Sequence, residues 1–215
     1  MNRQQLRQSM ICLSLVVLLL AGCGGVQAGP TAVPTPVPPI PTPVTEPGAK
    51  RALFVIYPRF EEDEYNIPRS VLENAGVVVT VASSSLDLVK GGDKETEVLP
   101  DLLLADARGS EYDAIVFVGG MGVDVDDPEA QRIAQEAVAE AKVVAAICIA
   151  PIILAKAGVV EGKQVTAATQ WTTLEKAGAL VVTSGSVVRD GLIITANSPG
   201  GAREFGETIV AALEE

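Results

Sequence analysis

Cys148 is the residue of this chain best placed for chemistry. It follows a short apolar run over residues 142–147 that is typical of a buried strand, and it precedes a helical pattern over residues 149–156. Small residues, Ala146 and Ala150, lie two positions to either side, as a nucleophile on a sharp strand-to-helix turn requires. The N-terminus of the following helix is expected to lower the pKa of the thiol. The alternative is that Cys148 is a small hydrophobic residue of the core.

Cys148 lacks the partners that most cysteine chemistry uses. The 215 residues contain three cysteines and no histidine, which excludes Ser-His and Cys-His dyads and histidine-ligated metals. Cys12 and Cys23 belong to an N-terminal segment with a different role, so no disulfide framework is expected. We therefore expect no metal and no cofactor.

The N-terminal segment resembles a bacterial lipoprotein signal. Two arginines precede an apolar stretch, residues 10–21, that is too short for a comfortable membrane span, and residues 20–23, Leu-Ala-Gly-Cys, resemble a lipobox. The resemblance implies a lipoprotein signal peptide over residues 1–22 and a lipid on Cys23. The domain would then be extracytoplasmic and lipid-anchored to the cell membrane or an outer membrane. An ordinary secretory signal or a signal anchor is the alternative.

The rest of the chain is expected to comprise a linker and one domain. Residues 23–49, which begin with the lipidated cysteine, are rich in Pro and Thr and predict an extended tether of the polyproline type. Residues 50–215 have the length and apolar content of a single domain. The formal net charge of the chain is -11, which argues against nucleic acid as a partner.

Strand-like and helical patterns alternate along residues 50–215, which predicts an α/β fold with a mostly parallel sheet and helices on both faces. We expect strands over 52–57, 77–82, 114–118, 142–147 and 192–196, helices over 65–75, 126–141, 149–156 and 203–214, and a hairpin between 86 and 98. Ligands bind such sheets at the carboxyl ends of the strands. The segments expected to meet there are residues 58–64, Gly119-Gly120 and Cys148.

Several segments, in this order, resemble the ThiJ/PfpI superfamily. They are spread over nearly all of residues 50–215 and include Lys50-Arg51-Ala52-Leu53, the acidic loop that ends in Glu64, Ile67-Pro68, Val118-Gly119-Gly120, Ala145-Ala146-Ile147-Cys148, residues 190–195, Pro199-Gly200 and Glu204-Phe205. The similarity is closest to the branch of the parkinsonism-associated deglycases and redox sensors. It implies a flavodoxin-like three-layer sandwich and a homodimer.

The resemblance also implies roles for residues at the strand ends. Cys148 matches the cysteine of the sharp turn, and Glu64 matches the glutamate that hydrogen-bonds its sulfur. Gly119, Gly120 and Ile149 would form the backbone of an oxyanion site. A carboxylic acid beside a thiolate must stay protonated to donate a hydrogen bond, which burial would favour.

Three positions depart from the family pattern. Ile149 stands where the protease-like branch has a histidine, Ala168 stands where the deglycase-like branch has one, and Asn197 replaces an arginine. The first two changes argue against peptidase activity and leave Cys148 and Glu64 as the catalytic residues. The third removes a charge that would bind an anionic substrate.

The sequence is compatible with three functions. The first is a cysteine-dependent glyoxalase or deglycase, a lyase or hydrolase that acts on small reactive carbonyls such as methylglyoxal. The second is an oxidative-stress sensor or peroxide sink, in which Cys148 is oxidised to sulfenic and sulfinic acid. The third is a non-catalytic envelope domain that binds a ligand or a partner. The expected small-molecule partner is accordingly a carbonyl or an oxidant.

Overall fold

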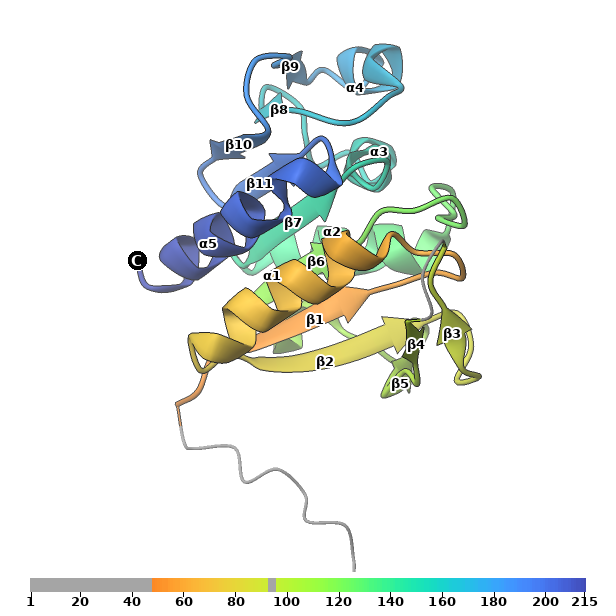
Figure 1. The fold of residues 1–215 in the computed structure, drawn as a ribbon. Helices are drawn as coiled ribbons and strands as arrows, with labels where there is room; N and C mark the ends of the chain where they lie inside the picture. Colours follow the sequence, from red (N-terminus) through yellow and green to blue (C-terminus); the bar gives the residue numbers. More distant parts are fainter. Residues whose placement is uncertain (1–47, 93–95) are drawn as a thin grey trace, which may run out of the picture. The chain divides into compact units, whose positions relative to one another are not determined.

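A seven-stranded sheet, whose inner strands are almost completely buried, forms the centre of the fold (Figure 1). The computed structural model describes residues 48–92 and 96–215. The strand order across the sheet is β10-β11-β7-β6-β1-β2-β5. Neighbouring strands are parallel except for β10 and β11, so the sheet has one antiparallel edge. The expected α/β fold with a mostly parallel sheet is confirmed.

The strands are short and largely apolar, as in sheets that are covered on both faces. In sheet order they are β10 (Val187–Asp190), β11 (Ile193–Ala196), β7 (Val143–Ile147), β6 (Ala114–Phe117), β1 (Arg51–Val55), β2 (Val78–Ser83) and β5 (Leu102–Leu103). The register places Leu53 of β1 opposite Thr80 of β2 and Ile115 of β6. The carboxyl ends of β1, β6 and β7 therefore lie next to one another.

Helices cover both faces of the sheet. Helices α1 (Glu62–Asn74) and α5 (Ala202–Leu213) lie side by side across one face, as Figure 1 shows. Helices α2 (Pro128–Ala139), α3 (Pro151–Lys156) and α4 (Trp171–Lys176) contribute to the core on the other face. The remaining short elements are β3 (Val89–Lys90), β4 (Glu97–Val98), β8 (Gln164–Val165), β9 (Leu180–Val181) and the 3-10 turns η1 (Gly109–Glu111) and η2 (Pro199–Gly201).

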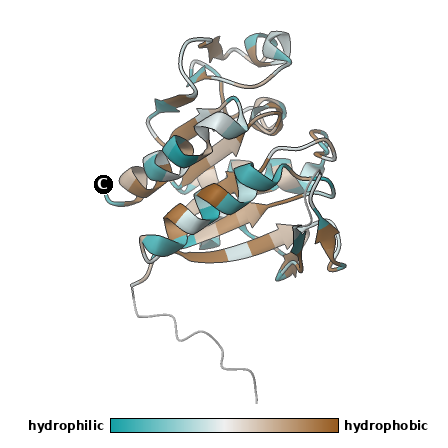
Figure 2. Ribbon diagram, in the orientation of Figure 1, coloured by the Kyte–Doolittle hydropathy of each residue, from teal (hydrophilic) through white to brown (hydrophobic). Residues whose placement is uncertain are grey.

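The apolar core has two halves because successive side chains of a strand point to opposite faces. In β1, Leu53 and Val55 pack in the core that includes α2 and α3, whereas Ala52 and Phe54 pack in the core that includes α1 and α5. Figure 2 shows the central strands coloured mostly as hydrophobic, while the covering helices also carry hydrophilic residues. Such a division of polarity fixes which face of each helix meets the sheet.

One expected boundary was wrong in a way that matters for the site. The helix expected over residues 65–75 begins at Glu62, so Glu64 lies in its first turn and not in a loop. The helix starts earlier because the Glu61 side chain accepts a hydrogen bond of 2.9 Å from the Glu64 amide and acts as the N-cap. Acidic residues in a first turn are also favoured by the helix dipole.

The expected hairpin between residues 86 and 98 is present as the antiparallel pair of β3 and β4. Strands β5, β8 and β9 were not expected, since two residues are too few to show a period. The expected signal peptide over residues 1–22 lies outside the described residues, and so does most of the linker over residues 23–49. Within residues 48–92 and 96–215, no helix is long and apolar enough to cross a membrane.

A truncation in the α2 half of the core is expected to destabilise the protein strongly. Ile133 is fully buried, so Ile133→Ala should lower the free energy of unfolding by about 2–5 kcal/mol, measured by urea denaturation. Val138→Ala, at a position of the same helix that is 39% exposed, is the matched control and should cost less than about 1 kcal/mol. Equal losses in the two variants would contradict this packing of α2.

Candidate active site

Cys148 lies on a tight turn directly after strand β7. Its backbone has a φ of 66°, in the left-handed region that a residue with a side chain adopts only when the surroundings hold it there. Two hydrogen bonds supply that constraint: the Cys148 amide donates to the Ala196 carbonyl at 2.9 Å, and the Cys148 carbonyl accepts from the Ala168 amide at 2.8 Å. The structure thus places the half-buried thiol on a sharp bend, as the sequence predicted.

Glu64, in helix α1, places a carboxyl group close to this thiol. It is completely buried in the first turn of α1, and neither carboxyl oxygen has a hydrogen bond of good geometry. The closeness of the two side chains is visible at Gly119, which separates them. A Cβ atom there would lie 2.3 Å from Oε2 of Glu64 and 2.5 Å from Cβ of Cys148. Only glycine leaves room for both.

The environment of Glu64 favours its protonated form. Burial raises the pKa of the carboxyl group to about 8, and the negative charge of Glu61 acts in the same direction. Interactions with Cys148 and with the Gly119 amide oppose the shift but do not cancel it. At neutral pH Glu64 is therefore mostly a neutral carboxylic acid, which agrees with the expectation that burial would keep its proton in place.

The expectation of a lowered thiol pKa was wrong. Burial and, after it, the negative charge of Glu64 raise the pKa of Cys148 to about 11, although the backbone amides of Ile149 and Gly120 act in the opposite direction. Helix α3 begins only at Pro151 and spans six residues, so its N-terminus is a weak source of positive potential. The resting site is a thiol beside a carboxylic acid.

The three expected backbone N–H donors interact with two different side chains. The amides of Gly120 and Ile149 act on the sulfur of Cys148, whereas the amide of Gly119 acts on the carboxyl group of Glu64. The Gly119 carbonyl accepts a hydrogen bond of 3.0 Å from the Glu61 amide. This bond ties the start of α1, which carries Glu64, to the loop after β6, which lies between the acid and the thiol.

The positions that depart from the family pattern also lie around Cys148. Ala168 is exposed to solvent, although its amide is hydrogen-bonded to the Cys148 carbonyl. Asn197 follows the residue whose carbonyl receives the Cys148 amide, and its side chain donates to the Gly185 carbonyl at 3.0 Å. Within the described part of the chain, no cluster of three His, Cys, Asp or Glu side chains has the arrangement of a metal site.

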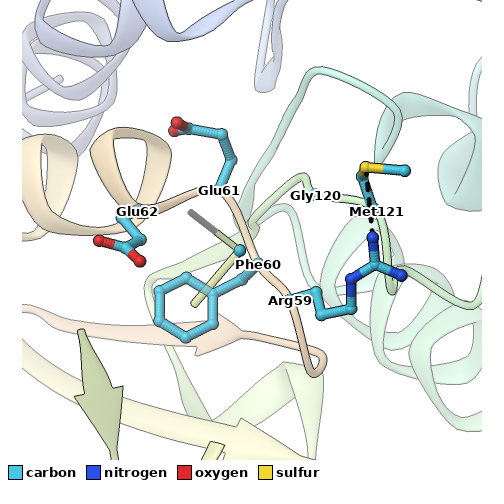
Figure 3. Close-up of a pocket in the computed structure, with 7 residues that line it drawn as sticks. Arg59, Phe60, Glu61, Glu62, Gly120 and Met121 are labelled. Atoms are coloured by element: carbon cyan, nitrogen blue, oxygen red, sulfur yellow. Dashed lines mark hydrogen bonds between the residues drawn. The ribbon is translucent and has the colours of Figure 1, made fainter. Parts of the chain in front are cut away.

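A pocket of about 130 Å³ shares Gly120 with the surroundings of the thiol, and the sequence did not reveal it. Its lining includes neither Cys148 nor Glu64, and it consists of Arg59, Phe60, Glu61, Glu62, Gly92, Gly120 and Met121. Figure 3 shows Arg59 extending toward Met121, away from the side chains of Glu61 and Glu62. No local pattern marks Arg59 or Met121, since they meet only in the folded chain.

The sequence of this chain is similar to the proteins of a known family. Residues 50–212 match the DJ-1/PfpI family. The chain belongs to this family. The match covers the whole sheet and its helices except the last residue of α5, and it includes Glu64 and Cys148.

Relatives of this DJ-1/PfpI protein come from distant organisms. An uncharacterised protein of Methanocaldococcus jannaschii is 36% identical over 174 residues, which cover 77% of this chain and 83% of the relative. The glutathione-independent glyoxalase DJR-1.2 of Caenorhabditis elegans is 30% identical over 168 residues, with 77% and 89% covered. A solved ThiJ/PfpI domain protein from Brachyspira murdochii superimposes with a TM-score of 0.74 at 30% identity and covers 78% of this chain and 98% of its own.

Removing the charge of Glu64 is expected to lower the pKa of Cys148. In Glu64→Gln the carboxylate that disfavours a thiolate is gone, so alkylation of Cys148 by iodoacetamide should rise at lower pH than the value of about 11 in the wild type. Peptide mass spectrometry resolves Cys148 from the other cysteines. Asp63→Asn makes the same change of charge in the same helical turn and should leave the profile nearly unmoved. A wild-type profile identical to that of Glu64→Gln would show that the two groups are not coupled.

Adding a methyl group at Gly119 is expected to separate the pair. The new Cβ of Gly119→Ala would overlap both Glu64 and Cys148, so the thiol titration should move toward its ordinary value and stability should fall by about 1–3 kcal/mol. Gly200→Ala is the control, because the nearest atom to a Cβ there is 3.7 Å away. Unchanged alkylation in a folded Gly119→Ala protein would contradict the close packing described above.

Proposed function

We propose that this protein is a membrane-anchored, extracytoplasmic enzyme of glyoxalase or deglycase type that acts on small reactive carbonyls. The observation that carries the proposal is the enclosed Glu64 carboxyl group beside the Cys148 sulfur, with the amides of Gly120 and Ile149 acting on that sulfur. The 30% identity to a glutathione-independent glyoxalase supports the same choice of substrate class.

The first step is addition of the thiol to an aldehyde such as methylglyoxal. A neutral carboxylic acid can act at both oxygens: one takes the proton of the Cys148 thiol while the other gives its proton to the carbonyl oxygen. Glu64 suits this role because it is protonated at neutral pH and neither oxygen is engaged by a well-formed hydrogen bond. The sulfur bonds to the aldehyde carbon, giving a hemithioacetal, and Glu64 ends the step neutral.

The second step converts the hemithioacetal to an acid. Once Glu64 has released its proton to solvent, its carboxylate removes the proton from the former aldehyde carbon and returns it to the neighbouring carbon, while the hydroxyl proton moves between the two oxygens. A lactoyl thioester results, and water hydrolyses it to lactate and free Cys148, so the overall reaction adds one water and exchanges no electrons with an oxidant. A pKa of about 8 makes Glu64 a base of suitable strength without histidine.

Oxidation of Cys148 is the second candidate function. The amides of Gly120 and Ile149 could hold a sulfinate oxygen, and a protonated Glu64 could donate a hydrogen bond to the other. The raised pKa of the thiol weighs against it, since the thiolate is the form that reacts with peroxide.

The cellular setting is part of the proposal. The Leu-Ala-Gly-Cys sequence at residues 20–23 supports lipid attachment at Cys23, and the Pro-rich segment after it supports a tethered domain. The family resemblance supports a homodimer. Mass spectrometry of the mature N-terminal peptide for an acylated Cys23, and light scattering of the purified protein, test these two points.

Lactate formation from methylglyoxal is expected to depend on Cys148 and on the ionisation of Glu64. Because the second step uses the carboxylate, kcat/KM should rise with pH through about 8. Glu64→Gln should lose the rise and at least about 100-fold in rate, and Cys148→Ser should be inactive. Asp63→Asn is the control and should keep the wild-type profile. Equal lactate production by Glu64→Gln would refute the mechanism, and peroxide consumption without lactate would favour the redox function.

A further inference from the structure

Met121 combines high exposure with a position one residue after Gly120, a backbone neighbour of the Cys148 thiol. Its side chain is 81% exposed, far more than apolar side chains usually are, and it directly follows Gly120, whose amide acts on the Cys148 sulfur. The chain has three methionines, and the other two, Met1 and Met10, fall in the expected signal peptide. A mature protein would therefore carry one methionine, beside its one reactive cysteine.

The thioether of Met121 has a cationic neighbour. The Arg59 guanidinium donates to Sδ of Met121 at 3.5 Å, and both side chains line the pocket that Gly120 also lines (Figure 3). A thioether is a weak acceptor, so this bond holds the exposed Arg59 side chain only loosely. The Arg59 backbone has a φ of 63°, in the left-handed region.

The two segments that carry these side chains cannot separate easily. The Met121 amide donates to the Arg59 carbonyl at 3.1 Å. One residue further on, a Cβ at Gly122 would lie 1.7 Å from the carbonyl oxygen of Pro58, so the backbones are in direct contact. An atom added to Met121 Sδ would therefore change the contact with the Arg59 side chain, because these backbone contacts keep the loop from moving away.

We propose that Met121 is a site of reversible oxidation by hydroperoxides, and that its sulfoxide holds Arg59 across the pocket that Gly120 also lines. The thioether sulfur gives two electrons to the peroxide, takes its terminal oxygen atom, and the other peroxide oxygen leaves as water or an alcohol with the proton. The sulfoxide oxygen is a far stronger acceptor than the thioether, and its bond with the guanidinium is charge-assisted. Methionine sulfoxide reductases reverse the change.

The oxidised pair narrows the pocket whose lining reaches Gly120. Access of carbonyl substrates to Cys148 then falls, so turnover of the proposed enzyme slows under oxidants and recovers after reduction. This last step rests on the proposed function. The formation of the sulfoxide and its hold on Arg59 do not, and they can be measured without substrate.

The test begins with the full-length protein and reversible protection of Cys148 as a mixed methyl disulfide. Hydrogen peroxide is added, dithiothreitol then restores the thiol without reducing a methionine sulfoxide, and peptide mass spectrometry locates the added oxygen. We expect one oxygen on Met121. Oxidation at Met121 no faster than in a peptide of the same sequence, with no effect on Arg59, would overturn the proposal.

The hold on Arg59 is measured with cyclohexanedione, which modifies accessible arginines. Labelling of Arg59 should fall about tenfold in the oxidised protein, the scale of one hydrogen bond to a charged group, while the exposed Arg203 serves as internal reference. In Met121→Leu, peroxide treatment should change neither Arg59 labelling nor that variant's own methylglyoxal turnover. In Arg59→Gln, Met121 should still oxidise but turnover should no longer respond to it.

The outcomes separate the two proposals. Slower Arg59 labelling in a protein that never makes lactate would support the modification and refute the carbonyl function. Lactate production that is indifferent to Met121 oxidation, with unchanged Arg59 labelling, would refute the modification and leave the carbonyl function standing. Recovery of labelling and turnover after treatment with methionine sulfoxide reductases is the final expected result.

Discussion

The enclosure of a carboxyl group against a thiol is the constraint on which the site depends. Glu64 is buried, so a charge there is costly, and Cys148 is close enough that a charge on either group disfavours a charge on the other. The pair therefore rests with both protons in place. In the proposed mechanism the substrate therefore has to accept a proton as the sulfur attacks, in contrast to sites where a histidine keeps the cysteine ionised.

The sheet makes this enclosure possible by bringing three chain segments to one edge. Strands β1, β6 and β7 are neighbours, and the residues after them are Glu61 to Glu64, Gly119 to Gly120 and Cys148. The Glu61 carboxylate caps α1 at the Glu64 amide, and the Glu61 amide is bonded to the Gly119 carbonyl. One residue thus starts the helix, joins it to the next loop and adds the negative charge that helps keep Glu64 protonated.

Much of this could be predicted from the sequence because the signals are local. Apolar runs marked the parallel strands, and small residues around Cys148 marked the sharp turn. The start of α1 was missed, since glutamate is an uncommon N-cap and Glu61 acts as one only with the loop folded against it. The direction of the thiol pKa depends on burial and on Glu64, which lies far away in the sequence, and the Arg59–Met121 contact spans 62 positions. Such through-space effects leave no local pattern.

The two backbone hydrogen bonds of Cys148 also bear on how such a site can diversify. The amide and the carbonyl of this residue are bonded to main-chain atoms of Ala196 and Ala168, so neither bond requires a particular side chain at those two positions. The exposed position 168 can therefore carry other side chains at little structural cost, whereas Gly119 cannot, because a Cβ there would overlap Glu64 and Cys148. The backbone turn at Cys148 thus does not depend on which side chain stands at position 168.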